Sequence, residues 1–297
     1  MTRRPLVAGL VAVPLLLAVP ALARTDRAGL EVSWSPSTPR VGDVAIVRVH
    51  GGGADAQVDG SLGGRPLTFF RDGRGHAALV GFDIDVPAGR QPWTVVVRVP
   101  GRPPRHARGD VRLAGREFSV QWLTLPEKMV DLDPETERRA LAEGETLRTV
   151  YRTVTPERLW HGGFVRPLTA TEPGSGFGSR RIINGKPRAP HAGTDYAAPR
   201  GTPVVVINDG RVALVGEYFF PGRLVVVDHG LGLYSLYFHL DEIGVVPGER
   251  VTRGQPIGTV GATGRATGPH LHFGVQVGAA RVDPERLLSL SGLEGRP

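Results

Sequence analysis

Residues able to bind a metal ion are concentrated in the last third of this sequence. Five of the nine histidines lie between His191 and His272. Imidazole and carboxylate groups together suit a zinc ion, whose catalytic sites use three protein ligands and leave one position open for water. The segment therefore predicts a zinc centre with histidines to spare for proton transfer. The candidate residues are His191, Asp195, His229, His239, His270 and His272.

The strand patterns around the later histidines indicate where these side chains point. Side chains alternate between the two faces of a strand, so His270 and His272 lie on one face while the apolar residues beside them lie on the other. The same alternation over residues 236–240 places Tyr237 and His239 together. One face then belongs to the core and the other to a polar groove.

His191 and Asp195 are four residues apart, but the prolines around them favour a loop that enters a strand. Gly193 allows a tight bend, so both side chains can wrap around one ion. The HExxH signature of helical zinc peptidases is absent, as is a GxSxG elbow with a paired histidine and acid. Those two classes of hydrolase are excluded as models.

The elements that must position these residues are predicted to be mainly β. With 41 glycines and 26 prolines in 297 residues, short strands and turns are favoured over long helices. We expect an immunoglobulin-like β-sandwich over residues 24–123, and a short helical linker over 124–160, with a helix of three or four turns starting at Asp133-Pro134. An antiparallel β domain carrying the histidines is expected over 161–297.

The formal charge of +7 comes almost wholly from arginine, because Lys128 and Lys186 are the only lysines. No run of five basic residues occurs, so nucleic acid is not expected as a partner. The absence of cysteine excludes disulfides, and both domains must be stabilised by burial alone.

The first 23 residues have the features of a secretory signal peptide. Arg3 and Arg4 precede an uncharged stretch that ends in Ala21-Leu-Ala23, a small-x-small cleavage site. An uncleaved membrane anchor is the alternative, because the stretch is close to the roughly 20 residues needed to span a bilayer. Pro14 and Pro20 favour cleavage. We expect export to the periplasm or cell envelope, with no stable membrane insertion afterwards.

Four segments together resemble the lysostaphin/LytM-type zinc metalloendopeptidases of bacterial cell walls, peptidase family M23. The likeness covers about residues 164–284, and the sequence Gly-Pro-His-Leu-His-Phe is its most specific part. The N-terminal part also resembles, more weakly, a β domain that precedes such peptidases in some exported proteins. The four segments are His191–Pro203, Tyr237–Leu240, Gly254–Gly258 and Thr263–Phe273.

The resemblance implies a role for each of five residues. His191, Asp195 and His272 would bind Zn²⁺, and His239 and His270 would form the catalytic pair beside it. Which of the two is the general base stays open. Zinc-bound water would attack an amide in the peptide stems or cross-bridges of peptidoglycan.

The sequence departs from the family pattern at one position. Some members use a tyrosine shortly before the first ligand histidine to stabilise the transition state, and residues 180–190 contain none. Arg181 or Asn184 is a substitute donor. We interpret His229 as a turn residue that does not bind the metal, and Tyr196 and Tyr237 as residues that line the groove.

Two alternatives to the endopeptidase remain open. One is a non-catalytic peptidoglycan-binding regulator of another wall hydrolase, a role known for members that have lost ligands. The other is a zinc carboxypeptidase or amidase on the same substrate. A regulatory protein partner is also compatible with the sequence. The N-terminal half could restrain the groove, in which case removing residues 24–160 would raise activity.

Overall fold

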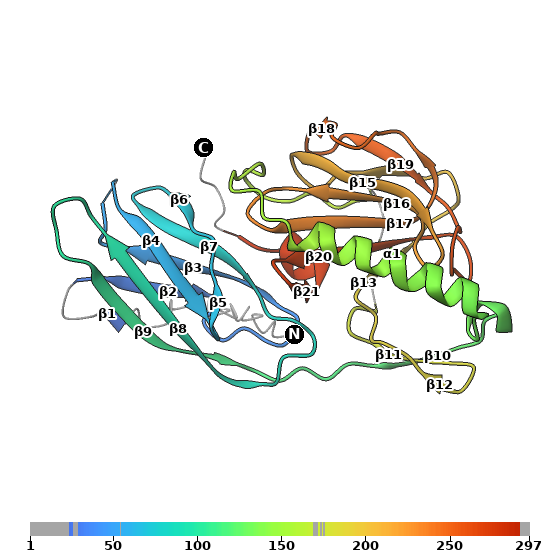
Figure 1. Cartoon of the computed structure of the whole chain (residues 1–297), viewed down its shortest axis with the longest axis horizontal. Coiled ribbons are helices and arrows are strands. Elements are labelled where there is room, and N and C mark those ends of the chain that lie inside the picture. Colours follow the sequence, from blue (N-terminus) through green and yellow to red (C-terminus); the bar gives the residue numbers. More distant parts are fainter. Residues whose placement is uncertain are drawn as a thin grey trace, which may run out of the picture.

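The computed structural model describes residues 24–25, 29–53, 55–168, 172, 174 and 176–291. The signal peptide predicted for residues 1–23 lies outside them. The chain is mainly β, as predicted, and its two halves lie side by side (Figure 1).

The N-terminal half is a sandwich of two antiparallel sheets. The two sheets share one core, which includes Val47 of one sheet and Trp93 and Val95 of the other. The immunoglobulin-type connectivity expected for this half stays a prediction. One sheet has the order β1 (Arg24–Thr25), β2 (Glu31–Ser35), β3 (Val44–His50), β7 (Gly75–Gly81) and β6 (Phe70–Asp72), and the other β5 (Arg65–Pro66), β4 (Gln57–Leu62), β8 (Gly89–Arg98) and β9 (Arg105–Leu113).

The C-terminal half is built on a nine-stranded antiparallel sheet. Tyr237, Leu271 and Phe273 point into its main core and are almost fully buried. The short helix α2 (Pro284–Leu288) ends this half. The main path of the sheet is β13 (Gly193–Ala197), β20 (His270–Val277), β17 (Leu233–Ile243), β16 (Gly222–Asp228), β15 (Gly210–Tyr218) and β18 (Arg250–Val251), with β14 (Pro203–Val205), β19 (Pro256–Val260) and β21 (Ala280–Val282) attached beside it.

The predicted linker helix is α1 (Pro134–Arg152), which is longer than the expected three or four turns. Asp133 caps it as predicted, accepting hydrogen bonds from the backbone N–H groups of Glu135 and Thr136. The helix lies across the sheet of β15–β17 (Figure 1), and its last turns, including Tyr151, pack on a cluster with Tyr234. This packing outweighs the cost of about 1 kcal/mol that Gly144 brings to a helix interior.

A small three-stranded sheet ties the connecting segment to the C-terminal half. Strand β10 (Val120–Leu123) pairs in parallel with β11 (Arg180–Ile183), which pairs with β12 (Lys186–Pro187). The turn η1 (Glu127–Met129) follows β10. Strand β10 lies at the end of the range predicted for the sandwich, but its hydrogen bonds go to β11. This is because β11 offers a free edge where the connecting segment passes it.

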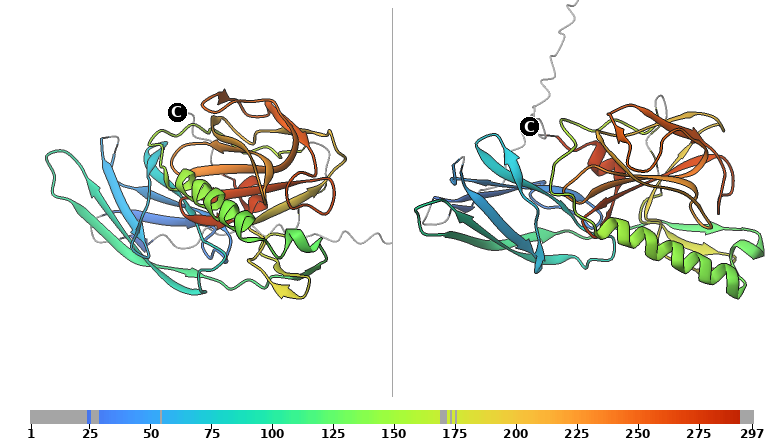
Figure 2. Two further views of the ribbon diagram at one scale, coloured as in Figure 1. Left: turned by 45° about the vertical axis from the view of Figure 1, so that its right-hand side comes forward. Right: turned by 45° about the horizontal axis from the view of Figure 1, so that its top comes forward.

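The two halves share a buried interface. Val44, Ile46 and Ala77 of the N-terminal sandwich belong to the same hydrophobic cluster as Val277 and Val282 of the C-terminal sheet. At the rim, Arg281 Nη2 lies 2.7 Å from Asp83 Oδ1, and Arg116 Nη2 lies 2.8 Å from Asp283 Oδ2. Both views in Figure 2 show the sandwich seated against the end of the C-terminal half. The halves are therefore joined by packing as well as by the chain.

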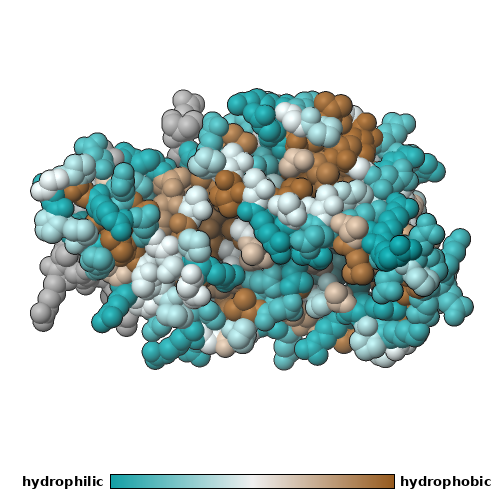
Figure 3. Space-filling model, in the orientation of Figure 1, coloured by the Kyte–Doolittle hydropathy of each residue, from teal (hydrophilic) through white to brown (hydrophobic). Residues whose placement is uncertain are grey.

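The surface in Figure 3 is mostly hydrophilic, with brown side chains gathered where the halves meet and over part of the C-terminal half. None of the helices in the described ranges is long and apolar enough to cross a membrane.

Candidate active site

Two neighbouring strands bring the first candidate ligands together. Strand β13 pairs with β20 so that Asp195 lies directly opposite His272. Residues opposite each other in an antiparallel pair share a face, so both side chains reach the same side of the sheet. His191 lies just before β13, as the loop-then-strand prediction required.

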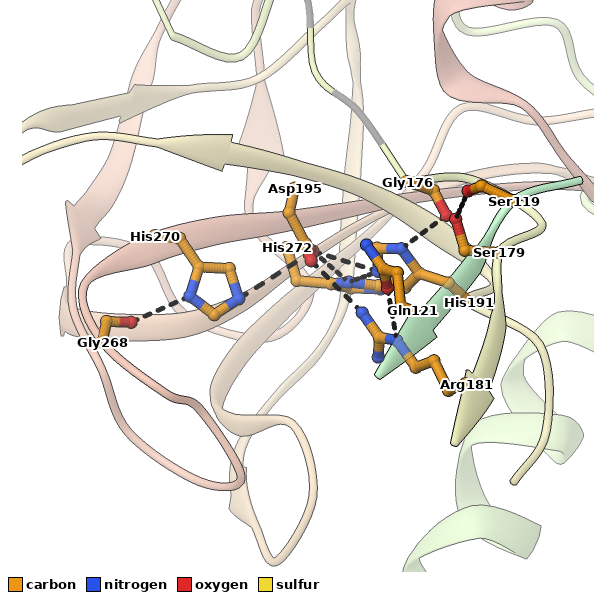
Figure 4. Close-up of polar contacts among 10 residues, drawn as sticks. All are labelled: Ser119, Gln121, Gly176, Ser179, Arg181, His191, Asp195, Gly268, His270 and His272. Atoms are coloured by element: carbon orange, nitrogen blue, oxygen red, sulfur yellow. Dashed lines mark hydrogen bonds and ion pairs between the residues drawn. The ribbon is translucent and has the colours of Figure 1, made fainter. Parts of the chain in front are cut away.

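The three predicted metal ligands converge on one point (Figure 4). His191 Nε2 lies 2.8 Å from His272 Nδ1 and 3.0 Å from Asp195 Oδ1. His272 Nδ1 is 2.9 Å from the same carboxylate oxygen. When the hydrogen of His191 is on its Nδ1, His191 Nε2 and the ionised Asp195 Oδ1 carry no hydrogen. Only His272 Nδ1 can then carry one among the three ligand atoms. Three lone-pair-bearing atoms in such a triangle fit a divalent cation, with two nitrogen ligands and one oxygen ligand.

The backbone of Gly176 fixes the orientation of His191. The imidazole Nδ1 lies 2.9 Å from the Gly176 carbonyl oxygen, and donating a hydrogen there leaves the Nε2 lone pair free. A side chain at Gly176 would crowd this ring, because a Cβ would lie 2.9 Å from His191 Nδ1, and φ is +90°. Sequence patterns gave no signal for this acceptor, since the carbonyl of any residue could supply it.

Arg181 binds the carboxylate oxygen of Asp195 that faces away from the ligand triangle. Its Nη2 donates to Asp195 Oδ2 over 3.2 Å, while its Nε donates to Gln121 Oε1 over 3.3 Å. Burial raises the pKa of Asp195, but its close contacts with the His191 and His272 rings outweigh burial and hold that pKa well below its usual range. The carboxylate is therefore ionised, as a metal ligand must be.

His272 is held between an aromatic ring and a glycine. The ring of Phe238, directly opposite on β17, stacks on the imidazole with centroids 5.3 Å apart. Gly193 approaches from the other strand, where a Cβ would lie 2.7 Å from His272 Nε2. Gly193 is thus required for close packing rather than for the bend that the sequence suggested. Burial lowers the pKa of His272 to about 4, so the imidazole is neutral at pH 7.

His239 reaches the site through an unusual backbone conformation. Its φ is +62°, in the left-handed region that non-glycine residues seldom adopt. Its backbone N–H donates to the Pro221 carbonyl over 2.8 Å, and its Nδ1 lies 2.8 Å from the Thr263 carbonyl oxygen. Burial lowers the pKa of His239 to about 3, helped by the neighbouring His272 and His270. The ring is neutral, with Nε2 free.

His270 completes the group from strand β20. Its Nδ1 lies 2.8 Å from the Gly268 carbonyl oxygen, and its Nε2 lies 3.8 Å from Asp195 Oδ1 (Figure 4). The imidazoles of His239 and His270 face each other with centroids 4.7 Å apart. The structure therefore gathers all five predicted site residues in one place, with the two non-ligand histidines as neighbours.

Neither tyrosine predicted to line the groove does so. Tyr196 follows Asp195 and faces the core, where its hydroxyl donates to Glu285 Oε1. Tyr237 is fully buried and accepts a hydrogen bond from the Ile207 backbone. The prediction failed for Tyr237 because it assumed regular alternation up to His239, whereas the left-handed residue turns His239 to the other face.

Two further residues have structural partners instead of site roles. His229 is completely buried, with Nδ1 2.7 Å from the Asp209 carbonyl oxygen and Nε2 2.7 Å from Ser235 Oγ. It lies at the turn, as predicted, but its ring is buried and hydrogen-bonded inside the core. Asn184 exchanges two hydrogen bonds with the Leu125 backbone, so it does not replace the family tyrosine. Of the two suggested donors, Arg181 alone borders the site.

Two of the predicted ligands, Asp195 and His272, and both extra histidines line one groove, and His191 is buried behind them. One wall comes from β10 and β11, including Gln121, Leu123 and Ile183, and the other from residues 265–267 and 270. Two arginines, Arg181 and Arg265, line it, against the single carboxylate of Asp195. The site is therefore an open, basic groove with imidazoles at its floor.

Comparison with known proteins gives matches over this half and over most of the chain. A model of Peptidase family M23 matches residues 189–284. A crystal structure of a Pseudomonas aeruginosa protein described as a peptidase M23 is 33% identical, with a TM-score of 0.65, covering 84% of this chain and 95% of that one.

Curated relatives match the C-terminal half. Over 100 residues the chain is 47% identical to the peptidoglycan DD-endopeptidase ShyA of Vibrio cholerae, covering 33% of this chain and 23% of that protein. Over 124 residues it is 40% identical to the DD-carboxypeptidase/endopeptidase Mpg of Neisseria meningitidis, covering 41% of this chain and 29% of that protein. The chain thus matches less than a third of the length of either relative.

Proposed function

The chain belongs to peptidase family M23, and on that basis we propose that it is a zinc metalloendopeptidase that hydrolyses amide bonds in peptidoglycan peptides. The observation that carries this proposal is the convergence of His191, Asp195 and His272 beside two further histidines that line an open groove. The named activity of the Vibrio relative supports peptidoglycan as the substrate, and that of the Neisseria relative supports cleavage of a peptide.

Zinc is the metal that best suits the donor set. Two imidazole nitrogens and one carboxylate form a three-ligand set of the kind found in catalytic zinc sites. When bound, zinc lowers the pKa of a coordinated water to about 7 and polarises a carbonyl group. Arg181 holds the Asp195 carboxylate with one oxygen turned to the ligand triangle, and the Gly176 carbonyl holds His191 in the tautomer that a metal requires.

His239 and His270 are placed to move protons at the reacting bond. Each donates its Nδ1 hydrogen to a backbone carbonyl, of Thr263 and Gly268 respectively, and so presents a free Nε2 lone pair. A neutral imidazole of this kind can take a proton from the attacking water and return it to the leaving amine. The protonated ring can also donate a hydrogen bond to the developing oxyanion. The two histidines are arranged so that either can be the base.

The test is digestion of purified peptidoglycan by the full chain, with product masses. We expect zinc-loaded protein to release peptide fragments and chelated protein to release none, with activity restored when zinc is added back. Release of the same fragments by both forms would exclude a metal-dependent reaction. Fragment masses also distinguish the endopeptidase from the carboxypeptidase or amidase alternative, because those enzymes release a single terminal residue or separate the peptide from the sugar. Binding of the wall without any cleavage would favour the regulator.

Export is part of the proposal and rests on the sequence of residues 1–23 alone. Protein recovered from the cell envelope with Arg24 as its first residue would support it. Recovery of the chain only from the cytoplasm, with Met1 or Thr2 first, would count against it.

A further inference from the structure

The loop between β19 and β20 organises one side of the groove. Within it, the Thr263 carbonyl accepts from His239 and the Gly268 carbonyl accepts from His270. Arg265 lies between these two acceptors in the sequence and lines the same groove as both histidines and two of the predicted ligands, Asp195 and His272. A group bound by Arg265 is therefore held beside the two histidines that act on the substrate.

Arg265 has a fixed base and a free cationic end. Its backbone N–H donates to the Phe220 carbonyl over 3.0 Å, and its guanidinium carbon lies 4.1 Å from the centre of the Phe220 ring. Within the described part of the chain, the guanidinium makes no ion pair and donates no side-chain hydrogen bond. Stacking on an aromatic ring leaves the edge of a guanidinium, with its N–H groups, available to a ligand.

The nearby charges do not neutralise Arg265. Burial, together with the positive charges of Arg181 and Arg188, lowers its pKa to about 10. Arg181 is already bound to Asp195, and Arg188 donates to the Val130 carbonyl and lies 3.7 Å from Asp131. Glu137 borders a depression on the other side of Arg265, but it is exposed and forms no ion pair with it. Arg265 is still protonated at pH 7, half-buried among other cations.

We propose that Arg265 is a specificity-determining residue, which binds a free carboxylate of the peptide substrate on the residue next to the bond that is cut. This inference rests on the proposed peptidase function and names the feature by which the groove selects its peptide. A planar guanidinium donates two parallel hydrogen bonds to a carboxylate, a geometry that an amide cannot match. The carboxylate also supplies a counter-ion, which none of the residues in the described ranges provides.

Two kinds of peptide carry a carboxylate at that position. In one, the residue after the cut bond is the last of its chain and bears the terminal carboxylate. In the other, the residue is joined through a side-chain amine, as in a cross-link, and keeps its own α-carboxylate. Both present the same group to Arg265, so the experiment includes a peptide of each kind.

The experiment compares four synthetic peptides with zinc-loaded full-length protein: each kind with the free carboxylate, and its twin with a carboxamide there. We expect the wild type to favour at least one carboxylate peptide over its twin by about ten- to a hundred-fold in kcat/KM, the range for a charge-assisted pair of hydrogen bonds. Arg265→Gln should remove that preference, because it lowers kcat/KM for the carboxylate peptide far more than for its carboxamide twin. The kind of peptide that shows the preference identifies the source of the carboxylate.

Arg188→Gln is the matched control, because it removes a charge from the same cluster but not from the groove, and should keep the preference. Binding of the carboxylate-bearing product, measured by calorimetry without turnover, should weaken by a similar factor in Arg265→Gln.

An equal loss of kcat/KM on both twins in Arg265→Gln would show a purely structural role and overturn the proposal. A wild type that cuts the twins equally would also overturn it, with the peptidase function intact. A wild type that cuts none of the four while releasing fragments from whole peptidoglycan would overturn the carboxylate site alone. If neither the four peptides nor whole peptidoglycan were cleaved, the proposed peptidase function itself would be wrong.

Discussion

Replacing His272 with alanine should abolish both metal binding and hydrolysis, whereas His270→Ala should abolish hydrolysis and retain the metal. The two residues are two positions apart on one strand, yet His272 Nδ1 lies within 3.0 Å of the other ligand atoms and His270 Nε2 stays 3.8 Å from Asp195 Oδ1. Loss of one of three protein ligands leaves too few to hold zinc. Loss of a proton-transfer group lowers kcat by about 10²- to 10⁴-fold.

Metal content by mass spectrometry, measured together with fragment release, separates the two outcomes. His106→Ala is the matched control, because His106 is an exposed histidine on β9, in the other half, and its loss should change neither readout. Equal loss of metal in the His270 and His272 variants would mean that the roles are assigned wrongly. Full activity in the His270 variant would remove it from the catalytic pair.

Gly222→Ala should impair the enzyme far more than Gly248→Ala. Both glycines have positive φ, +65° and +86°, so alanine at either position brings the same cost of about 1–2 kcal/mol for a left-handed residue. A Cβ at Gly248 meets nothing within 4 Å, but one at Gly222 collides with the backbone of Thr263. The hairpin end and the loop must then move apart, which adds about 1–3 kcal/mol of strain.

That displacement acts on catalysis because His239 is held from both sides of the contact. Its backbone bonds to Pro221, next to Gly222, and its ring bonds to the Thr263 carbonyl. A misplacement of about 1 Å can cost about 10²-fold in rate. Two measurements test this effect: the free energy of unfolding in urea, and kcat at a temperature where both variants are folded. Equal values of kcat for the two variants would show that the contact does not position His239.

The β-rich architecture could be predicted from the sequence because it depends on local patterns, and the five candidate site residues, whose roles come from the resemblance, lie together in the structure. The alternation around His270 and His272 correctly placed both on one face, and Asp133 correctly marked the start of a helix. The neighbours that complete the site could not be predicted in this way. The Gly176 carbonyl and the Phe238 ring come from other segments than the histidines that they contact, and only the tertiary fold brings them there.

The errors have a common physical origin in single residues that break a regular pattern. Regular alternation predicts the wrong face for Tyr237 because His239 adopts a left-handed conformation, which is uncommon even for histidine. The helix was predicted too short because Gly144 lowers its intrinsic stability, while packing of Tyr151 against Tyr234 restores it. Local propensity is a weak guide wherever tertiary contacts decide the outcome.

The buried interface between the halves has a consequence for how this chain can be altered. Ile46 and Ala77 belong to the same core as Val277 and Val282, so each half supplies part of the other's hydrophobic interior. The halves are thus not exchangeable modules, and substitutions on the two sides of the interface must compensate each other in size. Removing residues 24–160 would uncover this apolar surface. A restraint of the groove by the N-terminal half is therefore better tested in the intact chain, by substitutions that weaken contacts such as the Asp83–Arg281 ion pair, than by deleting the sandwich.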